Sequence, residues 1–403
     1  MLCFDSHVHV GNSEVKISAE NSELIAYKKY SPVTPEGYMR KALACGVSKA
    51  VIFPFPLMEI PFDEQNSYVM NAAQKFPYFF IPFLIPEPVE KIEKYPKDFA
   101  GIKDHFYFDF HNQINRNEIL EYAQAYDKVY LFHAHKKHWN DRIKLISKNF
   151  PKLRVVVAHA GRPEPFSGSG LHSRLNEFKK IIPAKVRDNF FFETSTIRNS
   201  ESIVALVNTF GDEHIIWGSD FPYYSEEKGQ VLSEELKVIR DAEISDDVKE
   251  KIFEKNFRKL YQKEDVWVRQ AMPGDFLSLR EMLSQISESE QKFLALKRKS
   301  SLVENQMKSG RHMLVAETSS GSLVGFLRKS DRHNRSVMIE EVYVSPKARG
   351  QHIATKLINA ITPSYESAEV KTFASNVAMN TILTRLNFIP KYSSKGTMIS
   401  WKR

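Results

Sequence analysis

The sequence of 403 residues contains only two cysteines, Cys3 and Cys45. Two cysteines cannot supply the disulfide framework of a secreted domain, so we expect free thiols in a reducing compartment. Long apolar runs are also missing: the longest, around residues 76–85, is interrupted by prolines and too short to span a bilayer. The start of the chain has no basic segment followed by an apolar one, so no secretory signal is predicted. These absences predict a cytoplasmic protein without a membrane partner.

The two parts of the chain differ in charge. Residues 1–262 hold 35 Lys and Arg against 36 Asp and Glu, whereas residues 263–403 hold 22 against 13. The basic excess predicts an anionic ligand in the second part, and a merely lysine-rich surface is the simpler alternative. Exposed aromatics are not interleaved with the basic residues, so we expect no nucleic-acid partner. We expect a small-molecule substrate, with self-association into a homo-oligomer as a further candidate interaction.

Eight short apolar runs alternate with amphipathic helical patterns up to about residue 262. Such alternation predicts parallel strands joined by helical crossovers. Eight units in some 260 residues is the size of a TIM (β/α)8 barrel, with an open doubly wound sheet as the alternative. The runs are Leu2–Val10, Ala50–Pro56, Tyr78–Leu84, Phe99–Phe108, Val129–His135, Arg154–His159, Phe190–Ser195 and Ile215–Asp220.

Polar side chains that can bind a metal end most of these runs. In the first run, Asp5, His7 and His9 alternate, so an extended strand places them on one face. Two imidazoles on a strand end can bind one cation, and an acidic neighbour can fix the tautomer. Because the carboxyl ends of barrel strands meet at one mouth, a metal site is predicted there. The other strand-end residues are Lys103, His105, His133, His135, His159, Glu193, Ser195 and Asp220.

Five segments resemble the amidohydrolase superfamily, in particular its aminocarboxymuconate-semialdehyde decarboxylase-like branch. The likeness covers essentially residues 1–262. The segments are Phe4-Asp5-Ser6-His7-Val8-His9, Gly101-Ile102-Lys103-Asp104-His105, Val156-Val157-Ala158-His159-Ala160-Gly161, Trp217-Gly218-Ser219-Asp220-Phe221-Pro222 and the closing helix Lys251–Tyr261.

The resemblance implies a catalytic metal site. One divalent ion, most often zinc, is expected on His7, His9, His133 and Asp220. His159 is expected to orient or deprotonate the attacking water, with Asp220 sharing the proton transfer. Hydrolysis of an amide, ester or lactone is the first expectation. Non-oxidative decarboxylation and a non-catalytic barrel are the alternatives.

Four further residues expected at the barrel mouth have implied or alternative roles. In some relatives a carboxylated lysine bridges two metals, which makes Lys103 a candidate for that role. His105 and His135 are expected to support the site or contact substrate. A Gly-, Pro- and Ser-rich stretch, Arg162–Gly170, is expected to be a loop over the mouth, and Arg162 is a candidate anion ligand.

A second domain is predicted over residues 266–403, after a short polar boundary at 262–265. Strands are expected at Val266–Arg269, Met313–Glu317, Leu323–Leu327, Val337–Val344, Val370–Ala374 and Thr397–Trp401, with helices near 275–309, 355–360 and 376–386. The turn Ser345–Ala354 joins a strand to a helix start, where backbone N–H groups and the helix dipole can bind phosphate.

This order of elements, with Val268-Arg269-Gln270-Ala271-Met272-Pro273-Gly274-Asp275 near its start, resembles the GNAT acetyltransferases, whose fold is α+β. The resemblance implies an acetyl-CoA site, with the pantetheine arm along the backbone of Val342 to Val344. It also implies that Glu341, or its neighbour Glu340, is the base, while Leu383 replaces a tyrosine that commonly serves as the acid. The pyrophosphate-binding residues implied are Arg349, Gly350, Gln351, His352, Ile353 and Ala354. His352 replaces the usual glycine, and its N–H is expected to remain available if the backbone there is helical.

Overall fold

The structure is a computed structural model. It describes residues 1–11, 33–57, 60–106, 108, 115–134, 138–161, 169–223, 231–287, 290, 305, 312–392 and 397–403. The chain divides into two compact units. The first comprises Met1–Ala73 and Phe80–Tyr261, and the second comprises Gln74–Phe79 and Gln262–Arg403.

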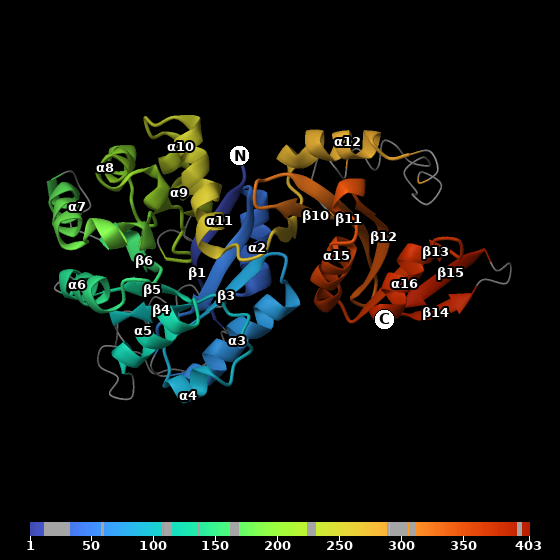
Figure 1. The fold of residues 1–403 in the computed structure, drawn as a ribbon, viewed down its shortest axis with the longest axis horizontal. Helices are drawn as coiled ribbons and strands as arrows, with labels where there is room; N and C mark the ends of the chain where they lie inside the picture. The colour runs from blue at the N-terminus through green and yellow to red at the C-terminus, as the bar shows by residue number, and fades with distance from the viewer. Residues whose placement is uncertain are drawn as a thin grey trace. The chain divides into compact units, whose positions relative to one another are not determined.

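The first unit contains eight parallel strands in the order β1 to β8 (Figure 1). Backbone hydrogen bonds from Ser6 N to Trp217 O (3.1 Å) and from His9 N to Phe221 O (2.8 Å) join the two ends of the sheet. A closed circle of strands confirms the predicted TIM barrel over the open-sheet alternative. The strands are β1 Cys3–Val10, β2 Val47–Pro54, β3 Phe80–Leu84, β4 Gly101–His105, β5 Val129–His133, β6 Val155–Val157, β7 Phe190–Glu193 and β8 Ile215–Ile216.

Helices follow the strands and cover the outside of the barrel (Figure 1). They are α2 Pro35–Ala44, α3 Phe62–Lys75, α4 Val89–Ile92, α5 Arg116–Ala125, α6 Trp139–Asn149, α7 Ser169–Ile181, α8 Ser200–Phe210, α9 Val231–Arg240, α10 Asp246–Glu250 and α11 Asn256–Tyr261, with a π-helical turn at Lys251–Lys255. Side-chain caps begin several of them: Asn199 Oδ1 accepts the Ser202 N–H at 2.8 Å, for example. Along the described stretches, no helix is both long and apolar enough to cross a membrane.

The barrel strands are buried on both faces, as parallel strands covered by helices must be. Every residue of β2, Val47–Pro54, is buried, and so is every residue of β1. Buried polar residues nevertheless occur in β1, where His7 and His9 lie in the carboxyl-terminal half of the strand, toward the mouth of the barrel.

The second unit is built on a seven-stranded mixed sheet in the order β14-β15-β13-β12-β11-β10-β9 (Figure 1). Together with its helices, this sheet agrees with the predicted GNAT fold. Its strands are β9 Val266–Gln270, β10 Met313–Thr318, β11 Leu323–Arg332, β12 Ser336–Val344, β13 Ser367–Phe373, β14 Ile389–Tyr392 and β15 Met398–Lys402, and its helices are α12 Phe276–Ser284, α15 Ile353–Ile361 and α16 Val377–Arg385.

Strand β14 was not expected from the sequence. It contains Pro390, which cannot donate to a ladder, and it forms the outer strand of the sheet, where a proline is tolerated.

Strands β12 and β13 pair over only part of their length. The parallel register runs from Ser336–Ser367 to Ile339–Val370. Beyond it, Glu341 to Val344 pair with β11, and Glu340 lies at a shift in that register, between Arg328 and Lys329. Among the described strands, none pairs with the other edge of β12 over Glu341 to Val344.

Candidate active site

Three donor atoms meet at the mouth of the barrel. His7 and His9 lie on β1, and Asp220 lies in the loop after β8. His7 Nε2 is 3.1 Å and His9 Nε2 is 3.4 Å from the same oxygen, Asp220 Oδ1. All three side chains are buried, and their donor atoms lie within 4.8 Å of one another. Three of the four predicted ligands, His7, His9 and Asp220, are thus brought together.

The partners of the two imidazoles define their tautomers. His7 Nδ1 lies 2.8 Å from Glu193 Oε2, and His9 Nδ1 lies 3.1 Å from the carbonyl oxygen of Pro54. Both partners are acceptors, so each Nδ1 carries the proton and each Nε2 keeps its lone pair. The lone pairs of both rings therefore point at the carboxylate of Asp220. Three acceptors that converge in this way fit a divalent cation, and the backing of each imidazole through Nδ1 is typical of metal ligands.

The protonation states of His9 and Asp220 suit a metal. Burial and Lys103 would lower the pKa of His7, but Glu193 and Asp220 raise it above its ordinary value, so a metal would have to displace a proton from that ring. Burial lowers the pKa of His9 to about 4, against the opposing effect of Asp220, so the ring is neutral at neutral pH. Burial alone would raise the pKa of Asp220, but His159 and His7 hold it well below its usual range. A neutral imidazole and an ionised carboxylate are the forms that bind metal.

Backbone conformation at the strand ends is shaped around this cluster. Asp220 has φ of +54° and His159 has φ of +53°, in the left-handed region that non-glycine residues rarely adopt. Gly218 allows a close approach: a Cβ there would lie 2.4 Å from Glu193 Oε1 and 2.9 Å from the Cβ of His7. The chain accepts unfavourable backbone geometry here to bring the polar groups together.

His159, the predicted base, is buried next to the ligands. Its ring centroid is 4.9 Å from that of His7, and its Nδ1 lies 2.7 Å from Ser195 Oγ. Ser195 Oγ donates to Glu193 Oε2 at 2.8 Å. Burial lowers the pKa of His159 well below its ordinary value, although Asp220 opposes the shift. The ring is therefore neutral and has a lone pair, but the lowered pKa makes it a weaker base than a free imidazole.

His133, the fourth predicted ligand, contacts the ring of His159. Its centroid is 4.6 Å from the ring of His159 and 4.6 Å from that of His105, and it stacks at 5.8 Å on Trp139. In the described part of the chain, the sets of donor atoms within 4.8 Å of one another do not include His133. Its role as a ligand stays a prediction.

Lys103, which suggested the two-metal alternative, is buried beside the ligands. Its Nζ lies 3.2 Å from His7 Nε2 and 5.0 Å from the centre of the Phe53 ring. Burial lowers its pKa to about 8, although Asp220 and Glu193 oppose the shift. His135 and residues 162–168 of the expected mouth loop, Arg162 among them, lie outside the described residues.

The expectation that Asp5 fixes a histidine tautomer is not met. Asp5 Oδ2 accepts from the hydroxyl of Tyr38 at 2.7 Å, and Oδ1 accepts the backbone N–H groups of His7 and Ser219, both at 3.0 Å. A register shift in β1 between Asp5 and Val8 interrupts the simple alternation of side chains. Asp5 thus ties β1 to the loop after β8.

Glu193, and not Asp5, is the carboxylate that bonds to His7 Nδ1 and fixes the tautomer of that ring. The sequence placed Glu193 and Ser195 at the end of a strand without giving either a role. A Glu-x-Ser pattern after a buried strand is the only local signal, and it does not reveal that β7 ends beside His7.

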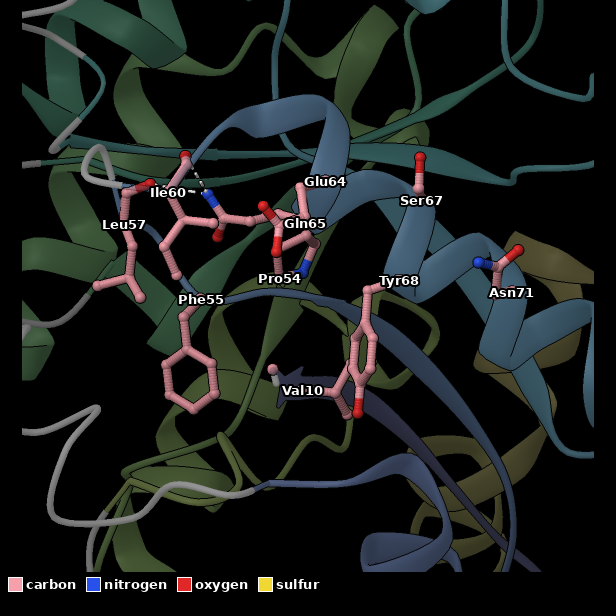
Figure 2. Close-up of a pocket in the computed structure, with 11 residues that line it drawn as sticks. Val10, Pro54, Phe55, Leu57, Ile60, Glu64, Gln65, Ser67, Tyr68 and Asn71 are labelled. Carbon is pink, nitrogen blue, oxygen red and sulfur yellow. Dashed lines mark hydrogen bonds between the residues drawn. The ribbon is translucent and has the colours of Figure 1, made fainter. Parts of the chain in front are cut away.

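A cavity of about 260 Å³ opens next to His9 (Figure 2). Phe55, on its wall, lies 5.3 Å from the ring of His9, and Val10 and Pro54 adjoin the same histidine. Gln65 Nε2 donates to Leu57 O and Ile60 O, and these hydrogen bonds hold the backbone of Leu57 and Ile60 against α3 on one side of the cavity. The lining is Val10, Gly11, Pro54, Phe55, Leu57, Ile60, Glu64, Gln65, Ser67, Tyr68 and Asn71. An apolar floor beside the ligands and a polar rim on α3 suit a small organic molecule.

In the second unit, the predicted phosphate-binding turn leads into α15. Gly350 has φ of +81° and His352 has φ of +59°. His352 is thus left-handed, not helical as its expected role assumed, and a glycine would avoid a cost of about 1–2 kcal/mol there. The helix begins at Ile353, so the N–H groups of its first turn lack intrahelical partners.

The remaining implied acetyl-CoA residues have partners within the protein. Arg349 donates to the carbonyl of Val344 at 3.1 Å and forms an ion pair with Glu290 at 2.6 Å. Glu341 is buried and accepts from Arg328 Nε at 2.7 Å. The backbone of Val342 and Val344 belongs to the part of β12 that β13 does not pair. Turn, helix start and open strand edge together fit an extended phosphate-bearing cofactor.

Comparison with known proteins supports both halves of this description. The amidohydrolase family model matches residues 4–263, and the model of the acetyltransferase (GNAT) domain matches residues 309–390. A 2-amino-3-carboxymuconate-6-semialdehyde decarboxylase of Caenorhabditis elegans is 32% identical over 81 residues, which are 18% of this chain and 20% of the relative. The chain therefore matches about a fifth of that relative's length.

Known structures resemble the barrel. A probable 2-pyrone-4,6-dicarboxylic acid hydrolase of Acinetobacter baumannii has a TM-score of 0.50 at 15% identity, covering 65% of this chain and all of its own. A putative hydrolase of the same type from Pseudomonas putida has a TM-score of 0.50 at 17% identity, covering 65% and 97%. A 2,6-dihydroxybenzoate decarboxylase has a TM-score of 0.50 at 13% identity, covering 65% and 99%. At such identities the likeness shows the fold alone.

Proposed function

The chain belongs to the amidohydrolase family over residues 4–263, and from this premise we propose that its barrel is a metal-dependent hydrolase of an amide, ester or lactone bond in a small molecule. The observation that carries the proposal is the convergence of His7 Nε2, His9 Nε2 and Asp220 Oδ1. Nitrogen donors with one carboxylate favour zinc among the common divalent ions. His133 is proposed as a further ligand.

The metal would polarise the scissile carbonyl group and lower the pKa of water at the site. His159 is proposed to accept a proton from the attacking water at Nε2, because its Nδ1 is bonded to Ser195. The same nitrogen then returns the proton to the leaving nitrogen or oxygen. The balance is bond cleavage by one water, which gives a carboxylic acid and an amine or alcohol.

The cavity beside His9 is proposed to hold the part of the substrate that does not react. Its floor of Val10, Phe55 and Leu57 suits a compact apolar group, either a ring or a branched chain, and its volume of about 260 Å³ suits a small one. The centroid of the Phe55 ring lies 5.3 Å from that of His9, so a group bound against Phe55 would lie close to a proposed metal ligand.

Decarboxylation is the second candidate for the barrel. It is favoured by the decarboxylases among the proteins that this chain resembles. The two reactions differ in their product, since hydrolysis consumes water whereas decarboxylation releases carbon dioxide.

For the second unit we propose acetyl-CoA-dependent N-acyl transfer. The turn from Arg349 to Ala354 is proposed to bind the pyrophosphate and the open edge of β12 the pantetheine arm. Glu341 is the proposed base. Its ion pair with Arg328 makes it a weak proton acceptor, so Glu340, which accepts from Ser330 at 2.5 Å, is the alternative.

A product assay tests the barrel proposal. Zinc-loaded protein is incubated with panels of amides, esters, lactones and aromatic carboxylates, and both titrated acid and released carbon dioxide are measured. We expect acid release that His159→Ala lowers about a hundredfold or more without loss of bound zinc. Carbon dioxide release alone would shift the assignment to a decarboxylase, and activity unchanged by His159→Ala would overturn the role of that residue.

A further inference from the structure

Glu193 is a fully buried carboxylate that receives hydrogen bonds from three parts of the barrel. Its Oε2 accepts from His7 Nδ1 at 2.8 Å, from Ser195 Oγ at 2.8 Å and from the backbone N–H of His159 at 3.2 Å. Its Oε1 accepts the backbone N–H of Ser195. Every contact is with a donor, so a single ionised carboxylate joins a proposed metal ligand to the proposed base.

The direction of these hydrogen bonds decides the tautomer of His159. A serine hydroxyl has one hydrogen, and Ser195 gives it to Glu193. Ser195 Oγ can therefore only accept from His159 Nδ1, 2.7 Å away. His159 must carry its proton on Nδ1, which leaves Nε2 bare. His7 is constrained in the same way by its direct bond to Glu193.

We propose that Glu193 and Ser195 are positioning residues that set both tautomers together. Glu193 keeps Nε2 of His7 bare as a ligand, and through Ser195 it keeps Nε2 of His159 bare as a proton acceptor. Gly218 supports this reading, because the fold leaves room for the carboxylate where a Cβ would lie 2.4 Å from Oε1. The catalytic roles of His7 and His159 in this inference rest on the proposed function. The assignment of their tautomers rests only on the hydrogen bonds.

A carboxamide at position 193 should unsettle both tautomers. The Gln NH2 meets a backbone N–H in either orientation, that of Ser195 at the Oε1 position or that of His159 at the Oε2 position. When the NH2 lies at the Oε2 position, it donates to His7 Nδ1 and to Ser195 Oγ, and both rings then carry their proton on Nε2. Glu193→Gln should therefore populate a second tautomer of both rings, in which His7 lacks its ligand lone pair. In Ser195→Ala only His159 loses the partner that fixes its tautomer, because His7 still bonds directly to Glu193.

The test uses the full-length chain labelled with 15N-histidine, before and after zinc loading. Long-range 1H–15N spectra distinguish a protonated ring nitrogen from a bare one, and His7→Gln and His159→Gln variants assign the two signals. We expect both rings to be Nδ1–H in the wild type and both to change in Glu193→Gln. In Ser195→Ala we expect His159 alone to lose its single tautomer. Thr194→Val, on the neighbouring side chain, should change neither ring.

Zinc affinity, measured against a competing chelator, supplies the second readout. Glu193→Gln should weaken binding about 10- to 100-fold, whereas Ser195→Ala and Thr194→Val should stay within about threefold of wild type. If Glu193→Gln fails to fold, the inference is tested by comparing the His159 ring signals of Ser195→Ala with those of the wild type. Unchanged tautomers in Ser195→Ala, or an Nε2–H His159 in the wild type, overturn the inference. Correct tautomers in a protein without hydrolase activity leave it standing and reject the proposed function instead.

Discussion

His7 Nε2 and Asp220 Oδ1 lie 3.1 Å apart, although the two residues are 213 positions apart along the chain. The contact exists because β8 closes the barrel onto β1, through the bonds of Ser6 to Trp217 and of His9 to Phe221. Barrel closure and assembly of the candidate metal centre are therefore the same structural event.

Lys103 should weaken the fold at neutral pH. Burial lowers its pKa from the ordinary 10.5 to about 8, so the folded chain binds fewer protons than the unfolded chain between those values. Stability of the metal-free protein should therefore rise as pH increases from about 8 to about 10, and Lys103→Met should add up to about 3 kcal/mol at pH 7. Urea unfolding across this pH range measures the effect. Lys237→Met, at a well-exposed position, should change little; an equal response in both variants contradicts the assignment.

Filling the cavity beside His9 should remove ligand binding there. Leu57→Trp places an indole in a space of about 260 Å³, so a compact aromatic ligand should lose access. The probe is 4-fluorobenzoate, followed by 19F NMR relaxation with zinc-loaded protein. We expect weak binding by the wild type, loss of at least about tenfold in Leu57→Trp and little change in Ser67→Ala on the exposed rim. Equal binding by all three proteins places the ligand elsewhere.

Acetyl-CoA binding should depend on charge at the turn before α15. Gly350 has φ of +81°, a conformation that Asn and Asp tolerate better than other side chains, and no atom would lie within 4 Å of a Cβ there. Gly350→Asp should weaken binding about tenfold or more by placing a carboxylate near the pyrophosphate, whereas the matched Gly350→Asn should bind nearly as the wild type does. Calorimetric titration with acetyl-CoA distinguishes them. A similar loss in both variants points to backbone strain instead of charge.

Leu383, which we expect at the place of the acid usual in GNAT enzymes, is completely buried. Leu383→Tyr should therefore cost about 1–3 kcal/mol of stability through overpacking, before any gain in catalysis. Thermal unfolding measures the cost, with Thr384→Tyr on the exposed side of α16 as the control. If Leu383→Tyr instead raises turnover and leaves the thermal stability unchanged, a cavity accommodates the hydroxyl group.

The sequence predicted the barrel because its signal is local. Each strand is a short apolar run, and most runs have polar residues at or near their ends, such as His9, His159 or Asp220. Because parallel strands all present their carboxyl ends at one mouth, topology alone converts those endings into a site. His7, His9 and Asp220 do meet there.

The partners of these residues could not be predicted in the same way. Asp5 is two positions from His7 in the sequence but bonds to Tyr38, whereas Glu193 reaches His7 across the barrel. That pairing depends on the angle at which β7 and β1 end, which no spacing in the sequence encodes. Likewise, the left-handed backbone of His352 follows from the turn before α15 and not from the residue's own preference.

The metal content of the purified chain tests the central claim most directly. Elemental analysis after zinc loading and gel filtration should find about one zinc per wild-type chain, and one also in a His214→Gln control, whose ring bonds to Phe190 O away from the site. His7→Gln/His9→Gln and Asp220→Asn proteins that stay folded should hold little or none. Two zinc ions in the wild type, with one lost in Lys103→Met, would support the lysine-bridged alternative. Stoichiometric zinc retained by the folded His7→Gln/His9→Gln protein would contradict the account.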